Sequence, residues 1–403
     1  MNQEYRTKKV FRIILSCMIG VALTIGAIFG IYRLIPILNE HFFAKVGLFQ
    51  SEEKDEARKK GTSSFSFVGV GNNIVHGAVY YWQELGQAAY DYDALYSLTS
   101  EYTETADISF INAETICAGT EYGLASYPTF NGPVQILDGI ANAGFNWMAM
   151  CSDHINDLGD EGIDTQINYL SDHYPHITYT GSHLTEEDSR LMNIINVNGI
   201  RVGVQSYTYN LGIHSLTDDK AWKINTVDRM KIEDEIEDLK LVSDVQIVSI
   251  HWGNEYSADV TDEQEEMARF LNEIGVDVIL GTHPHSIETA EIIHGDEGDT
   301  LCFYSLGDFM SCQDQENRLI GGMASFTMNY NHDTKEVSWD NVQFIPTITY
   351  FDAWFRTIRT TTIHEYTASL AASHCYPGAT PEYVREYVQA VMGEPEGIEV
   401  VLE

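Results

Sequence analysis

Basic side chains are the scarcest feature of this sequence. Its 403 residues include 23 Lys and Arg against 60 Asp and Glu, which gives a formal net charge of −37. Not one Lys or Arg occurs between Gly61 and Ser189. Nucleic-acid binding requires clustered basic side chains that displace counterions from the phosphates. The composition therefore argues against a nucleic-acid partner.

Cysteine, sequence repeats and low-complexity segments are also scarce or absent. The chain has six Cys, which is too few for a disulfide framework at this length. Pairing of Cys302 with Cys312 stays open. Aromatic residues make up 11% of the sequence, so a folded chain is expected rather than a disordered one. The length is sufficient for at least one large hydrophobic core.

Long apolar runs are rare, and one of them stands close to the N-terminus, at residues 13–32, IILSCMIGVALTIGAIFGIY. Twenty uncharged residues are about the length that crosses a bilayer as a helix. Lys8, Lys9 and Arg12 precede the run, so the positive-inside rule places the N-terminus in the cytoplasm and the main domain outside. We expect a single-pass cell-membrane protein with a cytoplasmic N-terminus (1–12), a transmembrane anchor (13–35) and a stalk (36–63). A cleaved signal peptide is the alternative.

Beyond the stalk, short β-rich runs alternate with amphipathic stretches, which predicts an α/β fold with buried sheets. The predicted strands are 64–70, 107–112, 146–150, 201–207, 245–252, 276–281 and 300–306. The predicted helices lie near 80–103, 133–143, 161–173, 228–242 and 262–274, and residues 380–393 are also helical in pattern. We expect one domain over 64–350 and a C-terminal extension over 351–403.

Polar residues cluster just after several predicted strands, where α/β folds place their sites. Five His, one Glu and one Asp stand at these positions, a mix of imidazole and carboxylate that suits Zn, Mn or Fe. They are His76, Glu114, Asp153, His154, His251, His283 and His285. In the segment His283-Pro284-His285, alternate residues of an extended chain would point to opposite faces. Both His can therefore ligate only if the Pro-containing turn redirects one of them.

Six segments resemble, in order, the motifs of the CapA family. They are DYDALYSLTSEYTETADISFINAET, YPTFNGP, AGFNWMAMCSDHINDLGDEGI, HWGNEY, GTHPHSIE and YSLGDF. The CapA proteins are poly-γ-glutamate capsule-synthesis proteins, and their domain is similar to calcineurin-like metallophosphoesterases. The resemblance runs from about Phe65 to Gln313, roughly three-fifths of the chain.

The resemblance implies a four-layer α/β/β/α sandwich of the metallophosphoesterase type, with a centre for two divalent metal ions, either Mn, Zn or Fe. Matched by position, the implied metal ligands are Asn72, His76, Glu114, Asp153, His251, His283 and His285. The resemblance also implies that His154 is the general acid that faces the leaving atom. Asp157 would orient or support it.

Three positions depart from the family pattern. That pattern has Asp where this chain has Asn72 and Asn where it has Asp153, and it usually has Asn where this chain has Asp308. The first two changes offset one another in charge. Our hypothesis is that Asn72 and Asp153 face the same metal pair, so that its ligand charge is conserved. The alternative is a degenerate site that binds metal poorly.

Three functions from different classes remain open. The first, which we take as the main prediction, is a membrane-anchored extracellular protein in the synthesis or export of poly-γ-glutamate or a related envelope polymer. Its partners would be the membrane, other capsule-synthesis membrane subunits and an anionic polymer or phosphoester. The second is an extracellular metal-dependent hydrolase of a phosphoester or a γ-glutamyl amide, and the third is a non-catalytic envelope scaffold.

The charge distribution bears on how an anionic substrate could be attracted. Ten basic and six acidic residues lie in residues 1–60, which leaves 13 basic and 54 acidic residues in 61–403. Attraction of an anion therefore depends on bound metals or on a few basic side chains. The candidates are Arg190, Arg201, Lys220, Lys223 and Arg318.

Overall fold

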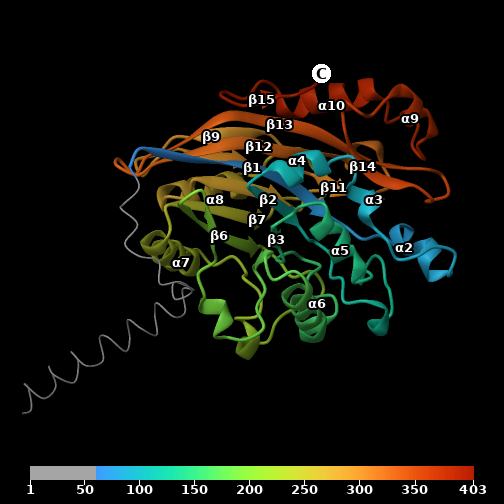
Figure 1. Ribbon diagram of the computed structural model, residues 1–403, viewed down its shortest axis with the longest axis horizontal. Helices are drawn as coiled ribbons and strands as arrows, with labels where there is room; N and C mark the ends of the chain where they lie inside the picture. Colours follow the sequence, from blue (N-terminus) through green and yellow to red (C-terminus); the bar gives the residue numbers. More distant parts are fainter. Residues whose placement is uncertain (1–59) are drawn as a thin grey trace, which may run out of the picture. The chain divides into compact units, whose positions relative to one another are not determined.

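The computed structural model describes residues 60–403 (Figure 1). The predicted cytoplasmic N-terminus (1–12), the transmembrane anchor (13–35) and nearly all of the stalk lie outside the described residues. Within residues 60–403, no helix has the length and apolar character that crossing a bilayer requires.

The described chain alternates strands and helices for most of its length. The strands are β1 (Thr62–Asn73), β2 (Ile108–Asn112), β3 (Trp147–Ala149), β4 (Thr178–Thr180), β5 (Ile194–Val197), β6 (Ile200–Thr208), β7 (Val245–His251), β8 (Val278–Thr282), β9 (Ala290–Ile293), β10 (Thr300–Phe303), β11 (Asp308–Met310), β12 (Ile320–Asn331), β13 (Val337–Phe351), β14 (Ile358–Thr362) and β15 (Glu399–Val400). The helices are α2 (Gly77–Glu84), α3 (Asp93–Tyr96), α4 (Ser100–Thr105), α5 (Gln135–Asn142), α6 (Gly159–His173), α7 (Arg229–Val242), α8 (Asp262–Glu273), α9 (Ala368–Ser373) and α10 (Pro381–Met392).

The first sheet of the described chain has nine strands, with the order β14-β13-β12-β1-β2-β3-β4 and with β11 beside β1 and β15 beside β13. The strands β1 to β4 run parallel to one another, and helices connect them, as parallel pairing requires. The strands β12, β13 and β14 continue the sheet in antiparallel fashion. Residues 351–403, expected to form an extension, supply β14 and β15 to this same sheet.

The second sheet has six strands among the described residues, in the order β5-β6-β7-β8-β10-β9. The four central strands are parallel, and the two edge strands are antiparallel to their neighbours. The helix α7 connects β6 to β7, and α8 connects β7 to β8.

The two sheets stack on one another, as Figure 1 shows, and the side chains of β7 alternate between two apolar clusters. Ile247 belongs to the large core that also contains Phe67 and Phe110 of the first sheet. Its neighbour Val248 packs instead with residues of α7 and α8 on the outer face. This is the two-residue period of a strand that is buried on both faces. The predicted α/β class with buried sheets is confirmed.

Most predicted elements occur with shifts of one to three residues at their ends, but the helix expected near 80–103 is wrong. The chain forms three short helices there, α2, α3 and α4, and Gly86 has a positive φ of 66° just beyond α2. Cys302 and Cys312 are both free thiols, so the disulfide left open does not form.

Candidate metal centre

The predicted site residues lie at the carboxyl ends of strands from both sheets. Asn72 belongs to β1, Glu114 follows β2, Asp153 and His154 follow β3, His251 ends β7, and His283 and His285 follow β8. Parallel strands in one sheet present their carboxyl ends at the same edge, which is where α/β folds place their sites. Here the edges of two stacked sheets meet, so one site draws on both.

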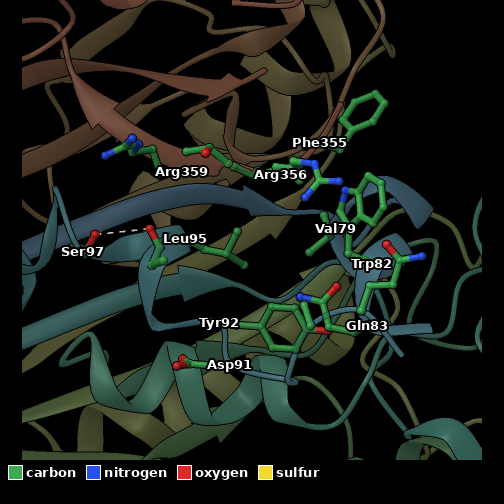
Figure 2. A pocket seen from close by; sticks show the side chains of 15 residues that line it. Val79, Trp82, Gln83, Asp91, Tyr92, Leu95, Ser97, Phe355, Arg356 and Arg359 are labelled. Carbon is green, nitrogen blue, oxygen red and sulfur yellow. Dashed lines mark hydrogen bonds between the residues drawn. The ribbon is translucent and has the colours of Figure 1, made fainter. Parts of the chain in front are cut away.

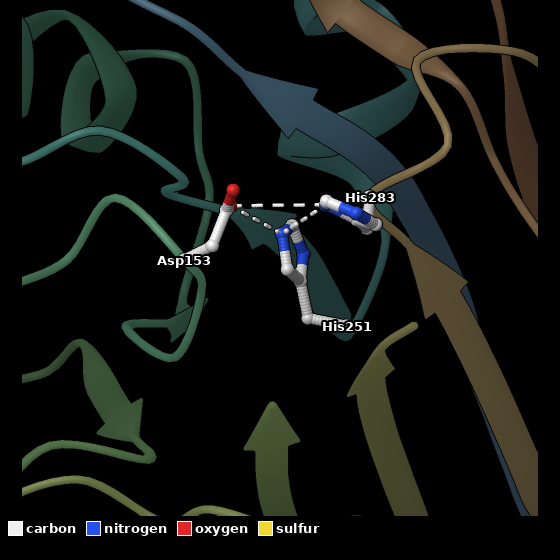
Figure 3. A group of neighbouring side chains, drawn as sticks. All are labelled: Asp153, His251 and His283. Carbon is white, nitrogen blue, oxygen red and sulfur yellow. Dashed lines mark hydrogen bonds and ion pairs between the residues drawn. The ribbon is translucent and has the colours of Figure 1, made fainter. Parts of the chain in front are cut away.

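Asp153, His251 and His283 form a compact buried cluster (Figure 3). The Asp153 Oδ1 atom lies 3.0 Å from His251 Nε2 and 3.7 Å from His283 Nδ1. The two imidazole nitrogens lie 3.1 Å apart. The Thr282 hydroxyl contacts His251 Nδ1 at 2.9 Å and leaves Nε2 facing the cluster. Three ligand atoms from two sheets thus converge at a spacing that suits one cation.

The His283-Pro284-His285 segment leaves the extended conformation at both His. The φ angles of His283 and His285 are 100° and 53°, in a region that costs a non-glycine residue roughly 1–3 kcal/mol. The turn brings both rings toward the same site, with ring centroids 5.9 Å apart. The turn that the sequence requires if both His are to ligate is therefore present. The backbone strain lies at His283 and His285, the two predicted ligands themselves.

A second group consists of Glu114, His285 and Asp308. The His285 Nδ1 atom lies 3.0 Å from Asp308 Oδ1, and His285 Nε2 lies 3.7 Å from Glu114 Oε1. Both oxygens of Glu114 and the Oδ2 atom of Asp308 are buried without a hydrogen-bond partner among the described residues. Burial raises the pKa of Glu114 to about 8, and the charges of Asp153 and Asp308 act in the same direction. Burial by itself lowers the pKa of His285, but the charges of Glu114 and Asp308 raise it to about 10, so in the metal-free chain the imidazolium supplies positive charge that a bound cation would replace.

Asn72, predicted as a ligand, is occupied by partners within the protein. Its Oδ1 accepts hydrogen bonds from Asn112 Nδ2 at 3.0 Å and from the backbone N–H of His283 at 3.3 Å. Its Nδ2 donates to Asp308 Oδ1 at 3.0 Å. A flipped amide would place Nδ2 against two donors and Oδ1 against a carboxylate, so these three partners fix the orientation. Asn72 therefore contacts Asp308 directly, and the hypothesis that Asn72 and Asp153 face the same metal pair stays a prediction.

His76, also predicted as a ligand, lies beside the site but presents a proton to it. Its Nδ1 accepts a hydrogen bond from the backbone N–H of Cys312 at 3.1 Å, so Nε2 is the nitrogen that carries the proton in the neutral ring. Burial lowers the pKa of His76 to about 4, which keeps the ring neutral. In this geometry His76 offers a hydrogen-bond donor and no free lone pair.

His154 and Asp157, predicted as the catalytic pair, are in direct contact. His154 Nδ1 lies 2.9 Å from Asp157 Oδ2, which also accepts the backbone N–H of Phe130 at 2.6 Å. Burial by itself lowers the pKa of His154, but the hydrogen bond to Asp157 and the charges of Asp153 and Glu114 raise it to about 9. The ring is therefore held in one orientation, with Nε2 directed away from Asp157.

The donor set fits divalent transition metals. Burial raises the pKa of Asp153, but hydrogen bonds to His251 and His283 bring it well below its ordinary value. Burial lowers the pKa of His251 to about 3. An anionic carboxylate and a neutral imidazole are the forms that bind a metal. A second possible cluster joins Asp153 to Glu114 and His154, whose ligand atoms lie within 4.8 Å of one another.

A family model described as "Bacterial capsule synthesis protein PGA_cap" matches residues 66–313, more than half of the chain. The chain belongs to this family. The "PGA biosynthesis protein CapA" of Bacillus subtilis (strain 168) is 28% identical over 176 residues, which cover 42% of this chain and 44% of the relative. The "Capsule biosynthesis protein CapA" of Bacillus anthracis is 26% identical over 180 residues, which cover 44% of this chain and 42% of the relative. The match spans less than half the length of each relative.

The likeness to solved structures is weaker. A structure titled as a novel phosphatase from Mycoplasma pneumoniae has a TM-score of 0.38 and 14% identity, covering 69% of this chain and 92% of that chain. The 5′-nucleotidase from Candida albicans SC5314 has a TM-score of 0.38 and 12% identity, covering 83% of this chain and 59% of that chain. At these TM-scores the likeness transfers no activity to the PGA_cap chain.

A pocket of about 310 Å³ opens over the candidate centre of this PGA_cap protein. Its lining includes Glu114, His154 and His285 from the site, together with His76. Its single Lys or Arg is Arg318. The pocket therefore places a ligand against Glu114 and His285 and beside His154; His154 Nε2 in turn lies 3.8 Å from Asp153 Oδ2 of the buried cluster.

Of the five basic side chains expected to attract an anion, the structure brings one to this pocket. The Arg318 guanidinium lies 3.7 Å from the ring centroid of Tyr256, and its Nη1 contacts Asp314 Oδ1 at 2.9 Å. The other four form ion pairs elsewhere: Arg190 with Glu186, Arg201 with Asp244, Lys220 with Asp160 and Lys223 with Asp164. Tyr256 and Asn112 are site residues that the sequence placed in turns after predicted strands but did not name as ligands or catalytic residues.

A second cavity, of about 400 Å³, lies between α2, α3 and the segment before β14 (Figure 2). Trp82, Tyr92, Arg356 and Arg359 are among its lining residues, and Arg356 lies 4.2 Å from the Trp82 ring centroid. Its single carboxylate is Asp91, and it contains no His. This cavity offers no metal-ligand cluster, so the metal chemistry belongs to the pocket at the strand ends.

Proposed function

We propose that this chain acts in the synthesis or export of an anionic envelope polymer such as poly-γ-glutamate, through a domain of the metallophosphoesterase type that hydrolyses a phosphoester or a γ-glutamyl amide. The observation that carries the proposal is the buried Asp153–His251–His283 cluster, which adjoins a pocket lined by His154. Family membership supports the capsule role. The donor set supports two divalent ions, of Mn, Zn or Fe.

The bound ions would act as Lewis acids and would lower the pKa of a water molecule. The chain itself supplies the proton for the leaving atom. His154 carries that proton on Nε2, because its Nδ1 is hydrogen-bonded to Asp157. In hydrolysis the water would lose one proton to solvent and its oxygen would join the attacked phosphorus or carbon. The bond to the leaving oxygen or nitrogen breaks, that atom takes the proton from His154, and His154 is then reprotonated from solvent. Asp157 is a positioning residue for this step.

The pocket has one basic side chain, Arg318, against the acidic Glu114, Glu255 and Asp314, so an anionic substrate would be attracted mainly by bound cations and oriented by Arg318. Arg318 is held against Tyr256 and keeps donors that its contact with Asp314 does not use. His76 adds a neutral donor beside it. Together they can orient a phosphate or carboxylate group while the reacting bond lies over Glu114 and His154.

The test is elemental analysis of the purified full-length chain together with a hydrolysis screen. The substrates are p-nitrophenyl phosphate, bis-p-nitrophenyl phosphate and γ-glutamyl-p-nitroanilide. We expect two bound metal ions per chain and turnover of one substrate. His283→Ala should lose metal and turnover, whereas His294→Ala, an exposed His paired with Asp299, should keep both. A wild-type chain with neither metal nor turnover would point to a scaffold that keeps only the fold.

We also propose that the domain lies outside the cell on a single N-terminal membrane helix, with other capsule-synthesis subunits as partners. The apolar run at 13–32 and the basic residues before it support this topology. In intact cells, a protease added outside should digest residues 60–403. Digestion that occurs only after lysis would contradict the topology.

A further inference from the structure

Asn72 and Asp308 are paired in register between β1 and β11, which run parallel. Both side chains are fully buried. The backbones approach so closely here that a Cβ atom on Gly71 would lie 1.9 Å from the carbonyl oxygen of Gly307. The backbone N–H of Asn72 donates to that same oxygen at 2.9 Å. The two side chains therefore have little freedom to separate.

In the Asn72–Asp308 pair, the direction of each hydrogen bond is set by the chemistry of the two side chains. Asn72 Nδ2 donates to Asp308 Oδ1, whereas Asn72 Oδ1 accepts from two donors. An amide provides both functions at once, and a carboxylate at position 72 would provide only the second. Asp at 72 would also lie against the carboxylate of Asp308. A carboxylate at one position of the pair therefore favours an amide at the other.

The carboxylate of Asp308, on β11, has one oxygen without a hydrogen-bond partner among the described residues. Asp308 Oδ1 contacts Asn72 and His285, but Oδ2 is buried and has no partner among the described residues. The two oxygens of Glu114 share that condition. His285 lies between the two carboxylates: Nδ1 contacts Asp308 Oδ1 at 3.0 Å and lies 3.3 Å from Asn72 Nδ2, so Nε2, which faces Glu114 Oε1 at 3.7 Å, is the nitrogen available to a cation. Buried carboxylate oxygens without partners mark a place that a cation stabilises.

We propose that Asp308 is a ligand of a second divalent cation, which it shares with Glu114 and His285. The carboxylate that the CapA pattern has at position 72 is thus supplied from β11, across the register pair. Asn72 holds Asp308 in place and does not itself ligate. This inference rests on the proposed metal centre, and the first cation would be held by Asp153, His251 and His283.

The test measures Mn²⁺ binding to the full-length chain by equilibrium dialysis and elemental analysis, without any assay of activity. We expect two equivalents for the wild type. Asp308→Asn should retain one equivalent and weaken the second at least 10-fold. The Asn72→Asp/Asp308→Asn double variant should restore the second equivalent to within about 3-fold. Asp299→Asn, a more exposed carboxylate paired with His294, is the matched control and should bind two.

The outcomes separate the two proposals. Wild-type binding of two ions, unchanged in Asp308→Asn, overturns the role of Asp308 and leaves the metal centre standing. A double variant no better than Asp308→Asn overturns the exchange across the pair. If Asp308→Asn fails to fold by near-ultraviolet circular dichroism, the double variant decides alone. A wild-type chain that binds no Mn²⁺, Zn²⁺ or Fe²⁺ refutes the metal centre itself.

Discussion

Asp157 illustrates how one buried side chain sets the chemistry of another. Its Oδ2 atom accepts the backbone N–H of Phe130 and lies against His154 Nδ1. The first contact anchors the carboxylate to the backbone, and the second fixes which nitrogen of His154 faces the pocket. The pKa of His154, about 9, depends on this contact because burial alone acts in the opposite direction. Asp157 thus keeps a buried imidazole charged at neutral pH.

We predict that Asp157→Asn lowers the pKa of His154 to about 6.5 or below, because burial is then less well compensated. The measurement is an NMR titration of the His ring resonances in the metal-free chain. Asp160→Asn, which removes an exposed partner of Lys220, is the control and should leave the titration of His154 unchanged. An identical midpoint in wild type and Asp157→Asn would show that the neighbouring carboxylates, and not Asp157, hold the proton.

The sequence identified His251, His283 and Asp153 by their place at strand ends, and these residues do converge. It predicted Asn72 and His76 as ligands but could not predict the partners that occupy their polar atoms in the structure, because those partners are distant in the chain. Asp308 and Cys312 each lie 236 positions from the residue they contact. Hydrogen bonds at that separation follow from the pairing of β1 with β11, which no local pattern encodes.

The helix α8 shows how an element is attached to the site. Its capping box joins Thr261 and Gln264, a pattern that sequence can reveal. The Gln264 side chain then donates from Nε2 to Glu288 Oε2 at 2.6 Å. Glu288 is buried, three residues after His285. The start of α8 is therefore tied to the turn that presents two of the candidate ligands.

We predict a pH dependence of stability from Glu288. Burial raises its pKa from 4.5 to about 8 in the folded chain. The fold favours the protonated acid, so this contribution is complete below about pH 4.5 and is lost as the pH rises to about 8, at up to ~1.4 kcal/mol per pH unit. Glu288→Gln should therefore gain roughly 4 kcal/mol over wild type between pH 5 and pH 8.5, measured by urea unfolding.

The matched control for this prediction is Glu265→Gln on the exposed side of the same helix. Its stability relative to wild type should change little between the two pH values. If the difference between Glu288→Gln and wild type is equal at pH 5 and pH 8.5, the buried acid is not protonated in the fold and the prediction is wrong.

Two of the strands that the sequence missed, β12 and β13, depart in composition from the usual strand pattern. The strand β12 begins Ile-Gly-Gly, and β13 contains Pro346 in its second half. Glycine and proline are depleted in strands, so neither segment reads as a strand. Packing outweighs that preference here: a Cβ atom on Gly322 would lie 2.0 Å from the Phe344 ring. The glycine is required by the neighbouring strand.

The molecule as a whole carries far more acidic than basic side chains. With 13 basic and 54 acidic residues in 61–403, most carboxylates have no cation to pair with. Several of the basic residues already form ion pairs, including Arg201 with Asp244 at 2.6 Å. Such an excess destabilises the compact state through repulsion between like charges, and salt screens this repulsion.

We predict that raising NaCl from 20 mM to 500 mM at pH 7.5 increases the melting temperature of the metal-free chain by roughly 3 °C or more. Differential scanning calorimetry measures the change. At pH 4.5, where many exposed carboxylates are protonated, the same addition should have a much smaller effect. A melting temperature that is constant or falls with salt at pH 7.5 would mean that repulsion does not limit stability.

The cluster of Asp153, His251 and His283 has a consequence for how the protein could be divided. Asp153 follows a strand of one sheet, whereas His251 ends a strand of the other sheet and His283 follows one. A chain cut between β4 and β5 would leave the carboxylate on one fragment and both imidazoles on its complement. Neither fragment would hold this ligand set, and only their reassociation would recreate it. Metal binding at this cluster would therefore be a direct measure of how far the two fragments have reassociated, and no added fluorescent or other label would be needed.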